Sequence, residues 1–128
     1  KNISLILGLS KPKVDVPAKP QTIDALDRNP ITLGVGNNVT ALTNTRITIK
    51  CRASGVPTPT VTWSTENRKI LSEEGGYIVQ EDGSLLVKVA DKVDTVRYTC
   101  TAVNFAGQDS ASSSVVVVGR VAEMCHIN

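Results

Sequence analysis

The chain has 128 residues, 41% of them hydrophobic and 20% charged, with a formal net charge of +2. This composition is typical of one soluble globular domain with some chain to spare. The small net charge argues against nucleic-acid binding, and the chain contains no apolar run long enough to span a membrane. Because the first residue is Lys rather than Met, we expect the chain to be a piece of a longer protein.

Residues 1–29 are predicted to be a leader or linker that is partly disordered. Residues 11–21 contain three prolines and few apolar side chains, and proline fixes φ and removes a backbone donor. The short apolar run at residues 3–9 lacks the charged start and cleavage pattern of a signal peptide. It could dock as an edge strand, but a disordered tail is the favoured interpretation. Residues 119–128 are predicted to be a second tail or linker.

Between residues 30 and 118, stretches with a two-residue hydrophobic period predict a series of β-strands. The predicted strands, with residues 69–71 as either a strand or an irregular link, cover 31–35, 39–42, 46–53, 60–64, 69–71, 77–80, 84–89, 97–103 and 108–118. Asp82-Gly83 predicts a hairpin turn, and the Gly and prolines of residues 54–59 predict a loop. Seven or more short strands without an amphipathic helix predict an all-β sandwich formed by one domain at residues 30–118.

Two of the three cysteines, Cys51 and Cys100, fall on predicted inward faces of strands, and Trp63 does so on the strand that follows Cys51. A disulfide between two sheets, with the indole packed against it, would satisfy all three side chains. Tyr98 precedes Cys100 by two residues, so its ring can pack inward while its hydroxyl bonds back to the preceding corner.

The order Cys51…Trp63…Tyr98-x-Cys100 resembles the immunoglobulin fold and its tyrosine corner. Three flanking stretches resemble the I-set subgroup of that family: G-V-P-T-P-T-V-T-W at 55–63, D-G-S-L-L-V at 82–87 and A-V-N-F-A-G at 102–107. The resemblance covers roughly residues 30–118. It implies a sandwich of two antiparallel sheets with Greek-key connections, a Cys51–Cys100 disulfide, and Trp63 and Tyr98 in the core.

One departure from the family pattern is visible at the corner before Tyr98. Val96 follows Asp94 at the position where family members usually carry glycine. The departure concerns only the local geometry of that corner.

Two Asn-x-Ser/Thr sites are candidates for glycosylation. Asn38 is predicted to lie on an exposed turn, and Asn2 lies in the leader. A disulfide together with glycosylation sites points to an oxidising environment, and therefore to a secreted, extracellular protein.

The sequence offers little support for an active site. Cys125 and His126 are neighbours, but no third ligand or orienting acid accompanies them, so a linker or a cysteine paired outside this chain is favoured. The acidic pairs Glu73-Glu74 and Glu81-Asp82 are predicted to be solvated turn residues. With no phosphate loop or nucleophile elbow in the sequence, we expect no enzyme activity, no metal site and no cofactor.

The alternation of the strands predicts two candidate binding faces. On the immunoglobulin layout, one sheet exposes a basic strip that could hold sulfated glycosaminoglycan: Arg46, Lys50, Arg52 and Lys88. The favoured alternative is that these charges keep the sheet soluble and unpaired. The other sheet exposes a flat, uncharged face that could contact protein: Thr62, Ser64, Thr99, Thr101, Ser112 and Ser114.

For this second face too, the favoured alternative is that the residues have no binding role. Thr is common in strands, and Ser only keeps the surface soluble. Weak self-association is the other reading, and we expect the isolated domain to be a monomer. The face carries no aromatic or Arg anchor of the kind that dominates strong interfaces.

Together these observations predict a non-catalytic extracellular interaction or spacer module of a matrix glycoprotein. The module most resembles those of the ADAMTS-like and papilin group. Two alternatives are a module of an adhesion or signalling receptor and an intracellular I-set domain of a muscle-type scaffold. The expected partners are other extracellular proteins.

Overall fold

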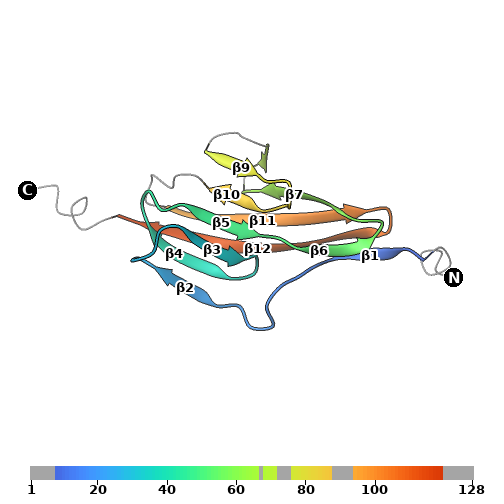
Figure 1. Ribbon diagram of the computed structural model, residues 1–128, viewed down its shortest axis with the longest axis horizontal. Helices are drawn as coiled ribbons and strands as arrows, with labels where there is room; N and C mark the ends of the chain where they lie inside the picture. Colours follow the sequence, from blue (N-terminus) through green and yellow to red (C-terminus); the bar gives the residue numbers. More distant parts are fainter. Residues whose placement is uncertain (1–7, 67, 72–75, 88–93, 120–128) are drawn as a thin grey trace, which may run out of the picture.

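A computed structural model describes residues 8–66, 68–71, 76–87 and 94–119 of the chain, and every regular element in these residues is a β-strand (Figure 1). The strands are β1 Ser10–Val14, β2 Thr22–Ala25, β3 Ile31–Gly34, β4 Asn38–Leu42, β5 Ile47–Lys50, β6 Ala53–Val56, β7 Thr60–Ser64, β8 Lys69–Ile70, β9 Tyr77–Val79, β10 Leu85–Val87, β11 Asp94–Asn104 and β12 Gly107–Val118. Between residues 31 and 118, all of these strands except β6 lie where the two-residue period predicts strands.

The larger sheet has the strand order β2-β4-β12-β11-β7-β8. Its centre is the long hairpin of β11 and β12, in which Cys100 lies opposite Ala111. Strand β7 pairs with the other edge of β11 and places Trp63 opposite Cys100. The sequence around Cys100 therefore forms the middle of this sheet.

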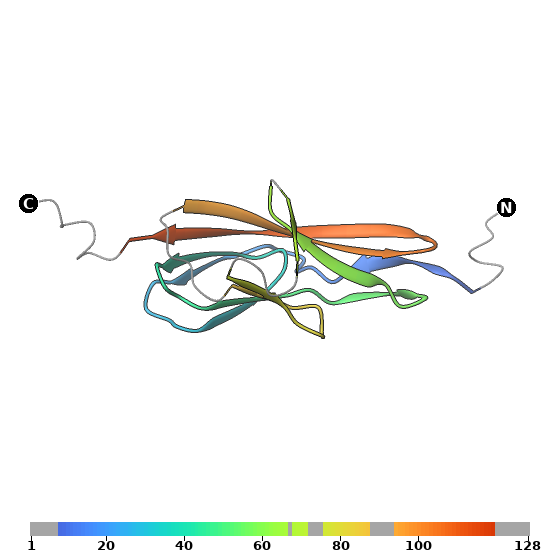
Figure 2. The ribbon, with the colours of Figure 1, turned by 90° about the horizontal axis from the view of Figure 1, so that it is seen from above.

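The smaller sheet has the order β3-β5-β10-β9. The predicted hairpin at Asp82-Gly83 is confirmed, since β9 and β10 pair antiparallel on either side of it. Backbone bonds close the turn, with the Gln80 amide donating to the Ser84 carbonyl at 2.8 Å. Figure 2 shows the long β11–β12 hairpin along one side of the molecule and the strands of the smaller sheet on the other side.

The core lies between the sheets and is built from the inward residues that the alternation predicts. The buried residues that fill it from both sheets are mainly Ile, Val, Leu and Ala: Ala25, Ile31, Leu33, Val35, Val39, Ala41, Ile47, Ile49, Leu85, Val87, Ala102, Val115 and Val117. Cys51 and Cys100, both buried, form a disulfide with a Cα–Cα distance of 6.5 Å. This bond links the end of β5 to the middle of β11 and so joins the two sheets.

Trp63 is buried beside this disulfide, and its indole N–H donates to the Gly83 carbonyl at 2.8 Å. The hydrogen bond satisfies the one polar atom of a side chain that otherwise fills apolar space. Because Gly83 lies in the β9–β10 turn, the indole also fixes this turn of the smaller sheet against β7 of the larger one.

Tyr98 is buried as predicted, and its ring packs edge-to-face on Tyr77 with a centroid distance of 5.8 Å. Its hydroxyl lies 3.4 Å from the Tyr77 hydroxyl. The predicted bond from Tyr98 to the preceding corner concerns residues that are only partly described. The contact that the structure places here runs to β9 of the smaller sheet, so Tyr98 is a second link between the sheets.

Tyr98 should make the fold sensitive to alkali. Burial, followed by the contact with the Tyr77 hydroxyl, raises the pKa of Tyr98 well above its usual range. Its neutral form therefore stabilises the fold below the unfolded pKa of about 10, and this stabilisation is lost as pH rises beyond that value. We expect Tyr98→Phe to show a smaller loss of melting temperature between neutral pH and pH of about 11 than the unchanged chain. An equal alkaline loss in Tyr98→Phe would contradict this role, and Tyr77→Phe, which keeps the buried phenol, is the matched control.

The segment expected to be a partly disordered leader is ordered in the two stretches β1 and β2. Strand β1 pairs antiparallel with β6, and β2 pairs parallel with β4. Val14 and Ala25 from these strands are buried in the core. The prediction of a leader or linker is therefore wrong for both stretches. The prolines do not prevent pairing because Pro12 lies in a two-stranded edge pair whose register shifts between Ser10 and Lys13.

The loop predicted at residues 54–59 is likewise a strand in its first half, because β1 supplies β6 with a partner. Gly55 allows this close approach: a Cβ at its position would lie 3.1 Å from the Pro12 Cα and 3.2 Å from the Asn104 Nδ2. Such contacts leave little room for any side chain.

The resemblance implied two antiparallel sheets, but neither of these sheets is purely antiparallel, because one edge of each contains parallel pairs. These pairs are β3 with β5, β4 with β12, and β2 with β4. Strands β3 and β4 run in opposite directions and belong to different sheets, so the chain reverses at residues 35–37. Gly36 has φ +103° there, and a Cβ would lie 2.8 Å from the Pro17 Cδ, which only glycine avoids.

Asn104 fastens β1 to the β6–β7 loop. Its side-chain Nδ2 donates to the carbonyls of Ser10 and Pro57, both at 2.9 Å, and its Oδ1 accepts from the Ala106 amide at 2.8 Å. One side chain thus bonds three backbone groups that belong to three different segments.

We expect Asn104→Ala to lower the free energy of unfolding by about 1–3 kcal/mol, because two carbonyls and an amide lose their partner. Urea unfolding followed by circular dichroism measures the change. Gln108→Ala removes an exposed amide from the same hairpin and is the matched control. Equal unfolding midpoints for the two variants would show that the Asn104 bonds contribute nothing.

Candidate functional site

The outer face of β7, β11 and β12 brings together the six hydroxyl residues that were predicted as a protein-contact face. Ser64, Thr99 and Ser112 stand opposite one another in one row across the three strands. Thr62 and Thr101 form the next row, and Ser114 lies beyond Ser112 on β12. All six are half-buried. We call them the hydroxyl face.

The six residues of the hydroxyl face lie at neighbouring positions on three paired strands, and none of them is charged. The Thr99 and Ser112 hydroxyls lie within hydrogen-bonding distance of each other at 2.8 Å. Arg97 stands opposite Ser114 at the margin, and its backbone amide donates to the Glu66 carboxylate at 3.3 Å. Because no charge needs to be desolvated within the face, another sheet or backbone could approach it at low cost.

The hydroxyl face ends at an apolar tip that the sequence reasoning missed. Phe105 lies in the turn between β11 and β12 and is 89% exposed, and Val103 next to it is 43% exposed. A surface hollow of about 400 Å³ in this region is lined by Pro57, Thr58, Thr60, Val103, Asn104 and Phe105. A Phe in a two-residue hairpin turn, where Asn, Asp or Gly is usual, was the available sequence signal.

The basic strip is only partly assembled. Arg46, Lys50 and Arg52 are exposed and follow one another along β5 and its flanks, whereas Lys88 lies outside the described residues. Acidic residues lie near the strip: the charge of Lys50 acts on Asp82, and a backbone bond of 2.8 Å from the Asp15 amide to the Arg52 carbonyl places Asp15 beside Arg52.

Hydrogen bonds from the backbone and the side chain of Ser84 lower the pKa of Asp82, and the charge of Lys50 lowers it further. Asp82 is therefore a carboxylate at neutral pH.

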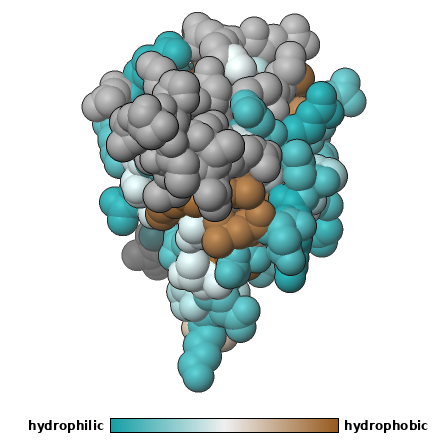
Figure 3. All heavy atoms as spheres, turned by 90° about the vertical axis from the view of Figure 1, so that its left-hand side faces the viewer, coloured by the Kyte–Doolittle hydropathy of each residue, from teal (hydrophilic) through white to brown (hydrophobic). Residues whose placement is uncertain are grey.

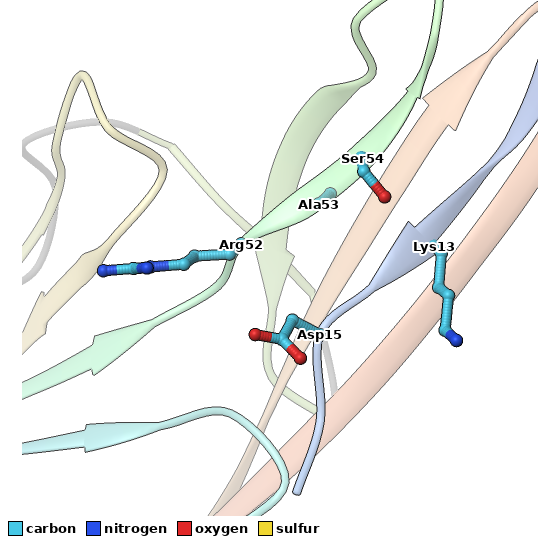
Figure 4. Close-up of a pocket in the computed structure, with 5 residues that line it drawn as sticks. All are labelled: Lys13, Asp15, Arg52, Ala53 and Ser54. Carbon is cyan, nitrogen blue, oxygen red and sulfur yellow. The ribbon is translucent and has the colours of Figure 1, made fainter.

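Strand β1 adds a cation that the sequence reasoning had placed in the leader. Lys13 pairs with Ser54 across β1 and β6. A hollow of about 390 Å³ is lined by Lys13, Asp15, Arg52, Ala53 and Ser54, and Figure 4 shows Asp15 standing between Lys13 and Arg52. The hollow carries two cations and one carboxylate, and all three are exposed. Because salt screens exposed charges, we expect the hollow to bind small or polyvalent anions only weakly.

The glycosaminoglycan contact stays a prediction, and heparin chromatography tests it. If the strip binds sulfated chains, the protein should elute above physiological salt and Arg52→Ser should elute earlier, because fewer cations are neutralised. Asp15→Ser is the opposite-sign control and should elute later. Elution of the unchanged chain at or below physiological salt would contradict the contact.

Asn38 was predicted to lie on an exposed turn. It is instead the first residue of β4, an interior strand of the larger sheet. Its Oδ1 accepts from the Ser114 amide at 2.9 Å, and its own amide donates to the Gln21 carbonyl at 2.8 Å. The side chain is half-buried and ties β4 to β12. This arrangement gives Asn38 a structural role, and its glycosylation stays a prediction. Asn2 lies outside the described residues.

Most of the residues considered for catalysis or metal binding lie outside the described residues: Cys125, His126, Glu73 and Glu74. Among the residues that the structure does describe, no group of three or more His, Cys, Asp or Glu side chains is placed to hold a metal ion. The same residues include no helix with the length and apolar character needed to cross a membrane.

Figure 3 views the end of the sandwich opposite the apolar tip. Outside the grey atoms, the surface that it shows is mostly hydrophilic, with a hydrophobic area near the centre. Leu26, which directly follows β2, is 41% exposed.

Comparisons with known proteins agree with this architecture. Hemicentin-1 of Mus musculus is 37% identical over 81 residues, which cover 62% of this chain and 1% of hemicentin-1. Neural cell adhesion molecule 1 of Bos taurus is 36% identical over 85 residues, which cover 65% of this chain and 10% of that protein. The chain thus spans a small part of the relatives it matches.

Among solved structures, titin domain M7 superimposes with a TM-score of 0.61 and 25% identity, covering 86% of this chain and 96% of that domain. The relatives include both extracellular proteins, such as hemicentin and the neural cell adhesion molecule, and intracellular ones, such as titin. A family model for the immunoglobulin I-set domain matches residues 31–117. The chain therefore belongs to the immunoglobulin I-set domain family.

Proposed function

We propose that this chain is a non-catalytic interaction or spacer module of an extracellular matrix glycoprotein. Domains of this family are generally binding modules without catalytic activity, and immunoglobulin domains mediate contacts between proteins. The matrix assignment goes further than the family does, since relatives occur on both sides of the cell membrane.

The buried Cys51–Cys100 disulfide is the observation that carries the extracellular assignment. Structural disulfides persist in oxidising compartments and are rare in the cytosol, where thiols are kept reduced. The bond joins the two sheets at the centre of the core, so it belongs to the folded state itself. A protein whose core depends on such a bond is suited to secretion.

A module of an adhesion receptor is the second candidate, favoured by the 36% identity to neural cell adhesion molecule 1. Both candidates are extracellular, and both act through contact with another protein. They differ in whether the parent protein is held at a cell surface or released.

The hydroxyl face supports a modest role in protein contact. It is large enough to cross three strands, uncharged, and bordered by the exposed side chains of Val103 and Phe105. The absence of aromatic and Arg side chains from the six residues of the face itself favours weak or multivalent contacts over a single tight one. This is the behaviour expected of one module among many in a long protein.

Localisation of the native protein tests the proposal. An antibody raised against the recombinant chain is used to probe culture medium, matrix extract, washed cell membranes and cytosol from cells that express the parent protein. We expect the signal in the medium and the matrix extract. Signal in the membrane fraction would favour the receptor candidate instead, and signal confined to the cytosol would overturn both.

A further inference from the structure

The apolar tip is the least explained surface of the described residues. Phe105 exposes 89% of its surface at the end of the β11–β12 hairpin. It flanks the hollow of about 400 Å³ whose other lining residues are Pro57, Thr58, Thr60, Val103 and Asn104. None of these lining side chains is charged. Covering this surface with an uncharged apolar segment is favourable in free energy, because water leaves both apolar surfaces and no charge is desolvated.

The amino-terminal part of the chain enters the domain at this tip. Strand β1 begins at Ser10, which pairs with Val56 at the end of β6. Asn104, which lines the hollow, donates from Nδ2 to both the Ser10 and the Pro57 carbonyls at 2.9 Å. Figure 1 shows β1 and the β11–β12 turn at the same end of the molecule. The residue that starts β1 is therefore bonded directly to the rim of the hollow.

The segment that precedes β1 has the chemistry that fits the hollow. Residues 3–7 read I-S-L-I-L, in which every residue except Ser4 is a large aliphatic one and none is charged. An extended chain advances about 3.3–3.6 Å per residue. Residues 3–7 therefore have the reach to fold back from Gly8 onto a hollow whose rim is bonded to Ser10.

We propose that residues 3–7 of this chain dock on the apolar tip and cover the ring of Phe105. The segment is tethered next to its site, which corresponds to an effective concentration in the millimolar range for a short connection. A modest apolar contact is then sufficient, whereas a second copy of the chain in dilute solution would have to bind much more tightly. A docked segment also fixes the direction in which the chain enters the domain, which goes beyond the general role of an interaction module.

The composition of the chain allows a sharp test, because Phe105 is its only phenylalanine. Biosynthetic incorporation of 4-fluorophenylalanine therefore gives a single ¹⁹F resonance that reports on the tip. The full chain is compared with a variant that carries Ile3→Ser, Leu5→Ser, Ile6→Ser and Leu7→Ser. Leu71→Ser is the matched control, since Leu71 is 55% exposed and follows the short strand β8, away from the tip.

We expect the ¹⁹F shift on moving from H₂O to D₂O, which measures contact of the ring with solvent, to be at most half that of free fluorophenylalanine in the full chain. In the quadruple Ser variant it should rise close to the free value, and in Leu71→Ser it should stay as in the full chain. Unchanged Trp63 fluorescence and melting temperature verify that the variants remain folded. The same solvent shift in the full chain and the quadruple variant would overturn the proposal.

Dilution separates the intended occupant from a second copy of the chain. A docked segment of the same molecule gives a ¹⁹F resonance that does not move with protein concentration. A resonance that moves toward the free value on dilution would show that the tip is covered by another molecule, and that result too would overturn the proposal. Neither outcome depends on whether the protein is secreted, so failure here leaves the proposed function standing.

Discussion

Replacing Cys51 by Ser is expected to lower the free energy of unfolding by about 4 kcal/mol. The disulfide closes a loop with a sequence separation of 49 residues, and the chain-entropy model assigns about this amount to such a loop. Cys100→Ser should have a similar effect, because either change opens the same loop. In both variants the new hydroxyl and the remaining thiol lie in a buried apolar site, which adds to the cost.

The size of this effect makes it decisive for the fold. A domain of this kind has a net stability of about 5–15 kcal/mol, so the loss removes a large share of it. Urea unfolding under non-reducing conditions measures the change, and Cys125→Ser is the control, because Cys125 lies outside the sandwich match at residues 31–117. Unfolding midpoints of Cys51→Ser and Cys100→Ser that equal that of the unchanged chain would refute the structural role of the bond.

Trp63→Ala is expected to cost about 3–5 kcal/mol, the usual range for deleting a large buried aromatic side chain. Trp63 is buried between β7 and the smaller sheet, and the change leaves both a cavity and an unpaired carbonyl at Gly83. The cavity cannot collapse easily, because the neighbouring Cys51–Cys100 disulfide fixes the two sheets relative to each other. The free energy of unfolding is followed by circular dichroism, since the variant lacks the only tryptophan.

Trp63→Phe separates the packing contribution from the hydrogen bond. Phe restores most of the ring volume but not the donor to the Gly83 carbonyl, so we expect a smaller loss, of about 1–3 kcal/mol. Thr62→Ala is the control on the same strand, since Thr62 points to the outer face. A loss for Trp63→Ala no larger than that for Thr62→Ala would contradict the central place of the indole in the core.

Most of the sandwich is predictable from the sequence because the two-residue period determines which side chains face inward. Ile47, Ile49 and Cys51 alternate with exposed or half-buried residues, and the structure buries all three. The hydroxyl face follows from the same rule, because the outward residues of three neighbouring strands must lie side by side once the strands pair. In these regions a local pattern is sufficient, and no knowledge of distant contacts is required.

The stretches that escaped prediction depend on partners far along the chain. Lys11, Pro12, Lys13 and Val14 do alternate, but the alternation acquires meaning only when β6 lies alongside, about forty residues later. Asn38 was read as a turn residue, yet a carbonyl at Gln21 and an amide at Ser114 hold it in a strand. Turn propensity is weak compared with such long-range hydrogen bonds.

The apolar tip illustrates the same limit for the candidate site. Phe105 falls between the predicted strands 97–103 and 108–118, and the sequence alone does not reveal that Pro57 and Thr58 lie beside it. Lys13 was assigned to a leader, so its place near Arg52 was missed. Surfaces formed where loops from separate hairpins meet have no periodic signal, whereas surfaces on a single sheet do.

The central claim is that this I-set domain folds around an oxidised Cys51–Cys100 pair in an extracellular compartment. Its most direct test is thiol mapping on protein from its native source, alkylated before unfolding and digestion and then analysed by mass spectrometry. We predict a disulfide-linked pair of peptides that carry Cys51 and Cys100, with at most Cys125 alkylated as a free thiol. Three alkylated cysteines would contradict the claim and would place the domain among the intracellular members of its family.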